Sequence, residues 1–407
     1  MEFRQTKLSN QLEVIAEIHP KAFTASYGVF VNTGARDEDA QISGMSHFLE
    51  HMVFKGTPTR NAAEINRQFD RLGASANAYT SEERTVYHAT VLPEFQEKTI
   101  ELLCDMMMPQ LDPHEFSTEK QVILEEISMY DDQPPYGGFE KAMELYFGRH
   151  PLSARVLGTH QSVEGITVEQ MAKYHSQRYR TGNICVCATG NVDFDQLVEQ
   201  VTKFSANWFV GDAGRKKESL PKGSGDSMMH HSAANQNYWI RFSPGPCRHD
   251  NDRYAMRLLS MVLGDETGSR TFWELIDTGL AEGAALFSQE YDDEGLLQAY
   301  LCTSPEDFEE AKSIFAAVIQ SALSQPVTDA ELQQAVRKVC SSILLSSEKS
   351  SNRLFTVGAA WLSRHTWETA EEIVAKYRSV TTNDLQRVAE KYLQSPALSL
   401  TVCAGSE

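Results

Sequence analysis

The chain has 407 residues and a formal net charge of −19 at pH 7. Its length exceeds what a single hydrophobic core usually supports, so we expect two domains. The negative charge argues against nucleic acid as a partner, because phosphate binding needs a positive surface, and it favours cationic peptides. No apolar run approaches the roughly 20 residues of a membrane span, so we expect no membrane association.

The chain opens with two strand-like segments, residues 12–18 and 25–31, without an apolar leader or an Arg-rich presequence before them. We therefore expect a cytoplasmic protein. Its seven cysteines are scattered and include no C-x-x-C pair, so we expect no disulfide framework. Cys185 and Cys187 share one face of a predicted strand, and we interpret both as small core residues.

The most informative segment is Gly44–Lys55 (GMSHFLEHMVFK), which holds His47, Glu50 and His51 in the order H-x-x-E-H. In a helix the two histidines lie one turn apart on one face, so both can bind one cation. A catalytic zinc site has three protein ligands and one position open to water, whose proton Glu50 could accept. The alternative is a chance pattern on a buried helix, and a third ligand would decide between these interpretations.

Residues 116–130 (FSTEKQVILEEISMY) supply candidates for that ligand on a predicted helix. Glu119 and Glu126 are seven residues apart and therefore share a face, whereas Glu125 is rotated toward solvent. One of the two could bind the metal while the other orients a ligand or a water molecule. The alternative is an ordinary acidic helix surface, which the upstream histidine pair disfavours.

The remaining elements suggest two units of similar architecture. In the first unit we predict helices at 62–72, 94–108, 113–131, 168–178 and 194–204, and strands at 85–91 and 183–190. In the second we predict strands at 238–242, 296–302 and 398–403, and helices at 252–263, 305–324 and 329–347. Residues 211–226, rich in Gly, Ser and charge, form the expected linker between domains at 1–210 and 227–407. We interpret its Arg215, Lys216 and Lys217 as solvated.

These motifs resemble those of the pitrilysin-like, inverted-zincin metallopeptidases, specifically the half-size subunits related to mitochondrial processing peptidase and its bacterial homologues. The matching segments are NTGARD at 32–37, GMSHFLEHMVFKGT at 44–57, NAYT at 77–80, residues 119–127, HPLSARVLGT at 150–159 and GNVD at 190–193. The resemblance implies an α+β fold of two similar domains, each a mainly antiparallel sheet covered by helices. The second domain contains no H-x-x-E-H, so we expect it to be catalytically silent.

By the same resemblance, His47, His51 and Glu126 bind one zinc ion per chain, Glu50 is the general base and Glu119 is the supporting carboxylate. Residues 75–80 (SANAYT) would be an edge strand against which an extended peptide lies, with contacts from Asn77 and Ala78. The small side chains of this segment leave room for another backbone. The alternative is a plain strand of small residues packed under a helix.

One stretch departs from the family pattern. Active relatives often carry an Arg and a Tyr in a stretch like I-R-E followed by G-L-x-Y, where they bind the substrate carbonyl and stabilise the oxyanion. Here Ile276 is followed by Asp277, and Gly279, Leu280 and Ala281 by Glu282. A carboxylate cannot stabilise an oxyanion. We therefore expect a different subunit with the Arg and Tyr to complete the site, as a heterodimer. A homodimer, or compensation by Arg270 or Tyr291, stays open.

The resulting hypothesis is a zinc endopeptidase that cleaves peptides or basic leader segments in a chamber formed by two subunits. The competing class is a non-catalytic assembly subunit of the same fold. Against it stands the complete set of His47, Glu50, His51 and Glu126, because a structural chain has no need to keep a base beside metal ligands. A zinc hydrolase acting on a non-peptide amide is the third alternative.

Overall fold

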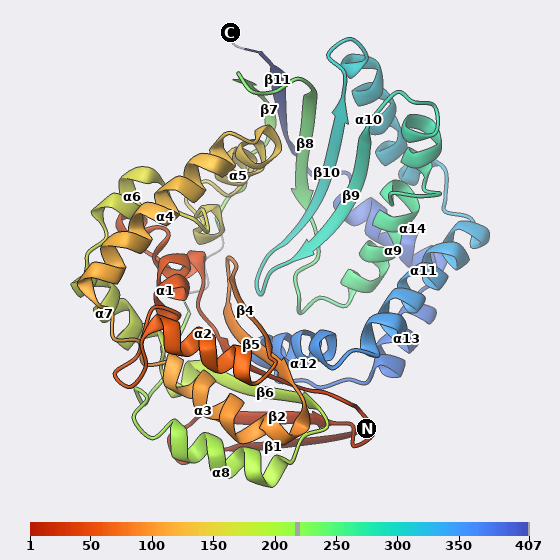
Figure 1. Ribbon diagram of the computed structural model, residues 1–407. Coiled ribbons are helices and arrows are strands. Elements are labelled where there is room, and N and C mark those ends of the chain that lie inside the picture. The colour runs from red at the N-terminus through yellow and green to blue at the C-terminus, as the bar shows by residue number, and fades with distance from the viewer. Residues whose placement is uncertain (216–219, 406–407) are drawn as a thin grey trace. The chain divides into compact units, whose positions relative to one another are not determined.

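The computed structural model describes residues 1–215 and 220–405 (Figure 1). The described residues form two compact units. The first unit lies within Met1–Ile127, Ala154–Lys216 and Ser346–Glu368, and the second lies within Ser128–Ser153, Lys217–Leu345 and Thr369–Glu407. The sequence analysis expected contiguous domains at 1–210 and 227–407. In the structure, residues 128–153 belong to the second unit and residues 346–368 belong to the first.

The first unit contains a six-stranded sheet in the order β1-β2-β6-β3-β5-β4. Its strands are β1 (Glu2–Lys7), β2 (Glu13–Ile18), β3 (Ala25–Val31), β4 (Ser75–Thr80), β5 (Thr85–Val91) and β6 (Ile184–Gly190). The pair β2 and β6 is parallel, and all the other neighbouring pairs are antiparallel. The central strands β3 and β6 are buried along their whole length, which explains their nearly continuous apolar sequences. β4 is left at one edge.

Helices cover both faces of this sheet. The larger apolar core of the unit includes residues from α1, α3 and α8. Seven of the helices in the first half of the chain belong to this unit, although the last residues of α4 lie in the second unit. They are α1 (Met45–Val53), α2 (Ala62–Arg71), α3 (Gln96–Met106), α4 (Pro113–Asp131), α6 (His160–Gly165), α7 (Val168–Arg178) and α8 (Phe194–Phe204). A second cluster joins α12 (Ser350–Arg364) to the other face of the sheet through Leu354 and Val357.

Specific contacts hold α12 in the first unit. Arg353 forms a buried ion pair with Glu17 of β2, and its Nε lies 2.7 Å from Oε1 of that carboxylate. The indole Nε1 of Trp367 donates to the same carboxylate at 2.8 Å. Gly358 lies so close to β3 that an added Cβ would be 2.3 Å from Cζ of Phe30. A segment from the C-terminal half is therefore part of the core around the first sheet.

The second unit contains a five-stranded sheet in the order β7-β11-β8-β10-β9. Its strands are β7 (Gly225–His231), β8 (Asn237–Pro244), β9 (Gly283–Glu290), β10 (Gly295–Thr303) and β11 (Leu398–Ala404). Its helices are α5 (Pro134–Phe147), α9 (Asp252–Gly264), α10 (Phe308–Ser324), α11 (Asp329–Ser347, which ends in the first unit), α13 (Ala370–Arg378) and α14 (Thr382–Tyr392). Two apolar clusters join these helices to the sheet. One includes residues of α9, α10, α11 and α14, and the other includes residues of α5.

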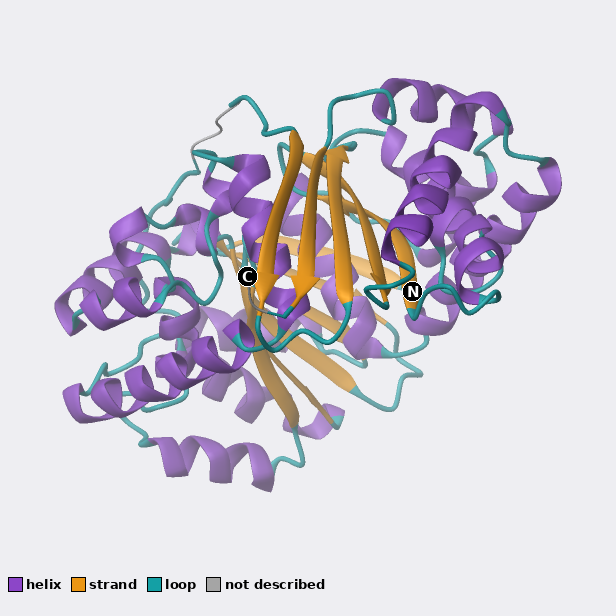
Figure 2. Ribbon diagram, turned by 90° about the horizontal axis from the view of Figure 1, so that it is seen from above, coloured by secondary structure: helices purple, strands orange, loops and turns teal. Residues whose placement is uncertain are grey.

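The two units repeat one architecture, as the sequence predicts. Each sheet is mainly antiparallel with helices packed against it (Figure 2). Each has one parallel pair, β2 with β6 and β7 with β11, and each ends in a hairpin whose edge strand is β4 or β9. After the 19-residue helix α4 or α11, the next helix belongs to the other unit. The expected α+β class with two similar domains is confirmed.

Arg215 corrects the expectation of a solvated linker. Its side chain is 9% exposed and pairs with Asp37, with Nη2 to Oδ2 at 2.7 Å. Arg178 pairs with the same carboxylate at 2.9 Å. Two cations thus share one buried anion, which fixes the start of the linker to the first unit. Lys216 and Lys217 lie outside the described residues.

The cysteines agree with the sequence analysis. All seven are free, and Cys185 and Cys187 are buried in the cluster beneath α12. Among the described helices, none combines the length and apolar character needed to cross a membrane.

Candidate metal centre

Helix α1 is anchored at its start by the side chain of Glu38. Gly44 adopts φ 91°, a left-handed conformation that glycine tolerates, and the helix begins at Met45. The side chain of Glu38 accepts the backbone N–H of Gly44 at 2.7 Å and that of Ser46 at 2.6 Å. These bonds satisfy donors that the first turn of a helix leaves unpaired. The position of the H-x-x-E-H segment is thereby fixed.

The helix buries its apolar side chains and groups its histidines. The buried apolar residues are Met45, Phe48, Leu49, Met52 and Val53. His47 and His51 lie one turn apart, with ring centroids 4.6 Å from each other. This confirms that α1 presents both imidazoles from one face.

Glu126 of α4 completes a three-residue cluster with the two histidines. Its Oε2 lies 3.9 Å from Nε2 of His47 and 3.9 Å from Nε2 of His51. Tetrahedral zinc with bonds of about 2.0–2.1 Å places its ligand atoms roughly 3.4 Å apart, and the three candidate ligand atoms all lie within 4.8 Å of one another. In the described part of the chain, this is the only group of three or more His, Cys, Asp or Glu residues able to hold a metal ion. The donor set fits zinc.

Glu119 orients His51 from behind. Nδ1 of His51 donates to Oε1 of Glu119 at 2.8 Å, which leaves the Nε2 lone pair directed at the cluster. Lys55 lies 2.5 Å from the other carboxylate oxygen. Burial opposes the charged form of Glu119, but His51 and Lys55 together hold the pKa of this carboxyl below its ordinary value. Burial also opposes the charged form of His51 and so lowers its pKa. The hydrogen bond and charge of Glu119 outweigh this effect, so the pKa of His51 lies above its ordinary value.

His47 is an uncharged ligand candidate. Burial lowers its pKa to about 3, and the nearby His51 adds to this effect. The neutral form is the one that binds a metal ion. Its Nδ1 is buried and has no hydrogen-bond partner among the described residues, in contrast to Nδ1 of His51.

Glu50 lies beside the cluster and is held by the edge strand β4. The hydroxyl of Thr80 donates to Oε2 of Glu50 at 2.6 Å. Burial raises the pKa of Glu50, and the Thr80 hydrogen bond and the charge of His51 oppose this rise. A carboxyl whose pKa lies closer to neutrality is a better general base than an ordinary glutamate. Glu125, by contrast, is exposed, as predicted from its angle on the helix.

Strand β4 has a free edge with alternating main-chain groups. Ser81 N–H donates to the carbonyl of Arg84 at 2.9 Å, which makes the last pair of the β4–β5 hairpin a hydrogen-bonded one. Pairs alternate in an antiparallel ladder, so the main-chain groups of Ala76, Ala78 and Thr80 point away from β5. The side chain of Asn77 accepts the freed N–H of Ala78 at 2.9 Å. The predicted edge strand is confirmed, while contact of Asn77 and Ala78 with substrate stays a prediction.

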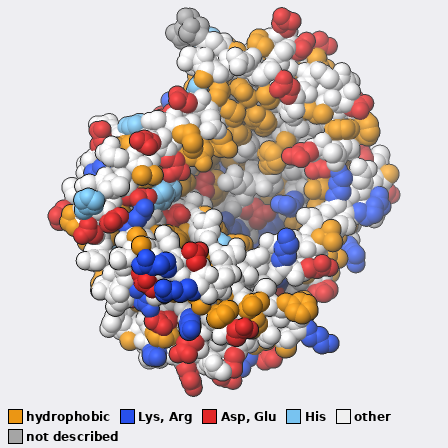
Figure 3. All heavy atoms as spheres, viewed as in Figure 1, with side chains coloured by type: hydrophobic (Ala, Val, Ile, Leu, Met, Phe, Trp, Pro, Cys, Tyr) orange, Lys and Arg blue, Asp and Glu red, His pale blue; other side chains and the backbone are white. Residues whose placement is uncertain are grey.

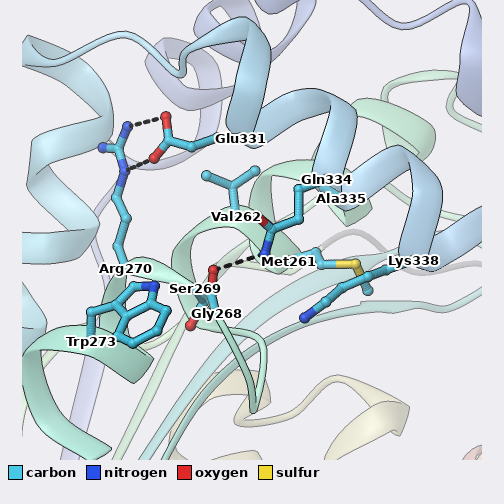
Figure 4. Close-up of a pocket in the computed structure, with 10 residues that line it drawn as sticks. All are labelled: Met261, Val262, Gly268, Ser269, Arg270, Trp273, Glu331, Gln334, Ala335 and Lys338. Carbon is cyan, nitrogen blue, oxygen red and sulfur yellow. Dashed lines mark hydrogen bonds and ion pairs between the residues drawn. The ribbon is translucent and has the colours of Figure 1, made fainter. Parts of the chain in front are cut away.

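Arg270 and Tyr291, the two residues considered as substitutes for the missing Arg and Tyr, both have other partners. The guanidinium of Arg270 forms two hydrogen bonds with Glu331, at 2.8 and 3.2 Å (Figure 4). Tyr291 is buried, and its hydroxyl accepts from Gln289 at 2.7 Å. Glu282 is exposed and accepts a hydrogen bond from Gln236 at 2.6 Å. Both residues considered for compensation are therefore committed to other contacts.

Three residues around the centre were missed by sequence reasoning: Glu38, Lys55 and Thr80. Lys55 follows His51 by four residues, which is a detectable signal for a shared helix face. Thr80 ends the NAYT segment, but its approach to Glu50 depends on how β4 packs against α1. Glu38 precedes the helix by several residues and carries no recognisable capping spacing.

Comparison with protein families divides the chain into two matches. Residues 13–160 match the model described as insulinase, peptidase family M16. Residues 165–339 match the model described as the peptidase M16 inactive domain. The first match contains all the residues of the candidate centre.

Individual relatives span nearly the whole chain. An uncharacterized zinc protease of Mycobacterium tuberculosis is 32% identical over 396 residues, which cover 96% of this chain and 90% of that protein. The structure of a protease from Helicobacter pylori superposes with a TM-score of 0.90, at 23% identity over 99% of both chains. A structure titled as the peptidase M16 inactive domain from Pseudomonas fluorescens gives a TM-score of 0.93 at 18% identity, covering 100% of this chain and 99% of that one. These two structures share the fold.

Proposed function

Because this chain belongs to peptidase family M16, we propose that it is a zinc-dependent endopeptidase with one zinc ion held by His47, His51 and Glu126. The observation that carries the proposal is the convergence of this ligand set with Glu50, a half-buried carboxylate beside it. The name zinc protease, borne by relatives such as the Mycobacterium tuberculosis protein, supports the choice of metal. Iron, cobalt or manganese could bind such nitrogen and oxygen ligands, so metal analysis is part of the test.

In the proposed reaction, Glu50 accepts a proton from the attacking water and later passes it to the leaving amine. Zinc, when bound, would polarise the scissile carbonyl and make water more acidic. Glu119 keeps His51 in the tautomer whose Nε2 can bind the metal. Thr80 holds one oxygen of Glu50 at 2.6 Å and leaves the other available for the proton transfer.

The proposed substrate is an extended peptide paired with the free edge of β4. Ala76, Ala78 and Thr80 direct their main-chain groups away from β5 there, and main-chain pairing makes little demand on peptide sequence. Asn77 and Ala78 would contact the peptide backbone, with the Asn77 carboxamide displaced from the Ala78 N–H. A non-peptide amide would leave these groups unused, which favours a peptide.

Basic peptides and leader segments are the substrates we propose to test first. The net charge of −19 favours cationic ligands. On the face shown in Figure 3, however, Lys and Arg side chains are interspersed with Asp and Glu, so this face has no single-sign field. Preference for basic residues would therefore come from the site itself. The cytoplasm is the proposed compartment.

For assembly, we propose a heterodimer in which a second subunit of the same family supplies an Arg and a Tyr for the oxyanion. Arg270 is hydrogen-bonded to Glu331, and Tyr291 is buried. Both facts favour a second subunit over Arg270 and Tyr291 as the source of the oxyanion-binding groups. The two subunits would enclose the peptide in a chamber. A homodimer with a different grip on the substrate is the alternative arrangement.

The alternative function is a non-catalytic assembly subunit. A peptide cleavage assay on the chain alone and after mixing with candidate partners separates these possibilities. The proposal expects cleavage of a quenched basic peptide that appears, or rises strongly, on mixing. Full activity of the chain alone would remove the heterodimer, and absence of metal and activity in every pairing would favour the assembly role.

A further inference from the structure

We propose that Thr80 is a positioning residue that ties the peptide-binding edge of β4 to the general base Glu50. This inference rests on the proposed function, and it assigns a role to a side chain that does not itself touch the metal ligands. It stands on three observations: the hydrogen-bond direction, the strand register and the packing of β4 against α1.

The hydroxyl of Thr80 has one proton, so it can donate one hydrogen bond. The neighbouring groups determine which atom accepts that bond. Its Oγ1 lies 2.6 Å from the carboxylate of Glu50 and 3.4 Å from Oγ1 of Thr85. The Thr85 hydroxyl donates to the carbonyl of Thr33 at 2.9 Å. Because a carboxylate only accepts hydrogen bonds, Thr80 donates to Glu50. This bond is charge-assisted and short, which is the strong class of hydrogen bond.

The same residue faces the free edge with its main chain. Thr80 pairs with Thr85 in register and, like Ala76 and Ala78, directs its N–H and C=O away from β5. A peptide strand added at this edge would therefore bond to the backbone of the residue whose side chain orients Glu50. One residue therefore takes part both in the pairing of the peptide and in the placement of the base.

The rest of β4 supports this geometry. Ala76 and Ala78 pack against the core that contains α1, on the face of the strand that also carries the Thr80 side chain. Their methyl groups hold the strand against the helix but cannot donate to Glu50. Among the described residues, Thr80 supplies the one side-chain hydrogen bond to the Glu50 carboxylate.

Removing the hydroxyl should therefore affect the reaction more than peptide binding. Thr80→Val keeps the shape of the side chain but loses the donor. We expect kcat to fall by about tenfold or more, a part of the roughly 10²–10⁴ that a positioned general base contributes. KM should change by less than about twofold, since the main-chain groups are unaltered. Zinc content should stay the same, because no ligand is touched.

Two further variants isolate the hydrogen bond. Thr80→Ser retains the hydroxyl and should restore most of kcat. Thr85→Val removes the facing hydroxyl of the same hairpin but not the bond to Glu50, so its kcat should stay near that of the wild-type chain. Thermal unfolding of each variant checks that the hairpin is folded, and Thr80→Ala replaces Thr80→Val if the latter does not fold.

The measurement is kcat and KM for one quenched peptide, made with the zinc-loaded chain in the form, alone or mixed, that shows activity. An unchanged kcat in Thr80→Val would overturn the inference while leaving the proposed peptidase intact. An equal loss in Thr85→Val would overturn it as well, because the effect would then come from loosening of the hairpin. A wild-type chain without peptidase activity in any form would overturn the proposed function and this inference together.

Discussion

Nδ1 of His51 and Oε1 of Glu119 lie 2.8 Å apart, although 68 residues separate them in the chain. The bond joins α1 to α4 and determines which imidazole nitrogen faces the cluster. Because Glu126 lies two turns further along α4, one helix supplies the proposed third ligand and also orients His51, the proposed second ligand. The centre is therefore rigid only if α1 and α4 keep their relative position.

Glu119→Gln should weaken zinc binding about 10- to 100-fold, the usual effect of losing a group that orients a metal ligand. The amide cannot supply the negative charge that favours a proton on Nδ1 of His51. Zinc affinity measured by competition with a chromophoric chelator tests this prediction. Glu125→Gln is the matched control, because Glu125 is exposed on the same helix and should leave affinity unchanged. Equal affinities in the two variants would contradict the role assigned to Glu119.

The buried carboxyl of Glu38 predicts a pH-dependent stability. Burial raises its pKa from the ordinary 4.5 to about 8, while the backbone donors of Ser46 and Gly44 partly oppose this shift. A folded-state pKa above the unfolded value gives stability that is complete below about pH 4.5 and is lost as pH rises through about 8. The size of the effect is several kcal/mol, since each pKa unit corresponds to about 1.4 kcal/mol.

Chemical denaturation of wild-type chain and Glu38→Gln across this pH range measures the effect. The amide does not titrate, so the difference in unfolding free energy between the two proteins should change steadily from pH 5 to 8. A constant difference would show that Glu38 keeps one protonation state in both the folded and the unfolded chain.

Helix α12 should be sensitive to any added bulk where it meets β3. In Gly358→Ala the new methyl group would lie 2.3 Å from the ring of Phe30, which is fully buried and cannot move away freely. We expect a loss of about 1–3 kcal/mol, the usual cost of overpacking a core. Gly137→Ala in α5 is the control, because nothing lies within 4 Å of its added Cβ. Thermal unfolding of both variants measures the difference. If Gly358→Ala were as stable as Gly137→Ala, the close packing of α12 against Phe30 would be contradicted.

The free edge of β4 predicts an alternating response to N-methylation of a peptide substrate. Only every second residue of β4 presents main-chain groups outward, so only every second peptide amide should pair with it. Methylating a pairing amide removes about 1 kcal/mol of hydrogen bonding, which is roughly a fivefold rise in KM. Methylating the intervening amide should have little effect. Equal effects at successive positions, measured as KM across a methylation series, would argue against strand pairing.

Local patterns predicted the elements of the centre well. Helix α4 (Pro113–Asp131) and strands β3 and β4 have the predicted bounds, and α1 lies within its predicted segment. Helical periodicity identifies α1 and α4, and a nearly continuous apolar run identifies β3, whereas the bounds of β4 came from the family resemblance. Grouping His47 and His51 with Glu126 also followed from spacing and the family resemblance, and the structure brings these three together.

Long-range placement was not accessible in the same way. The exchange of α5 and α12 between units depends on contacts such as Arg353 with Glu17, 336 residues apart, which leave no local signature. Arg215 was interpreted as solvated because its neighbours are polar, yet its partner Asp37 lies 178 residues earlier. Strand β9 was missed because its sequence, GAALFSQE, lacks a clear alternation of apolar and polar residues.

The most direct test of the account measures bound zinc and peptide cleavage together, in wild-type chain, Glu50→Gln and Glu126→Gln. We predict one zinc per chain and cleavage for the wild type, in its active form alone or mixed. We expect one zinc without cleavage for Glu50→Gln, because only the base is lost, and loss of stoichiometric zinc for Glu126→Gln. Cleavage by Glu50→Gln at the wild-type rate, or full zinc content in Glu126→Gln, would contradict the proposed function.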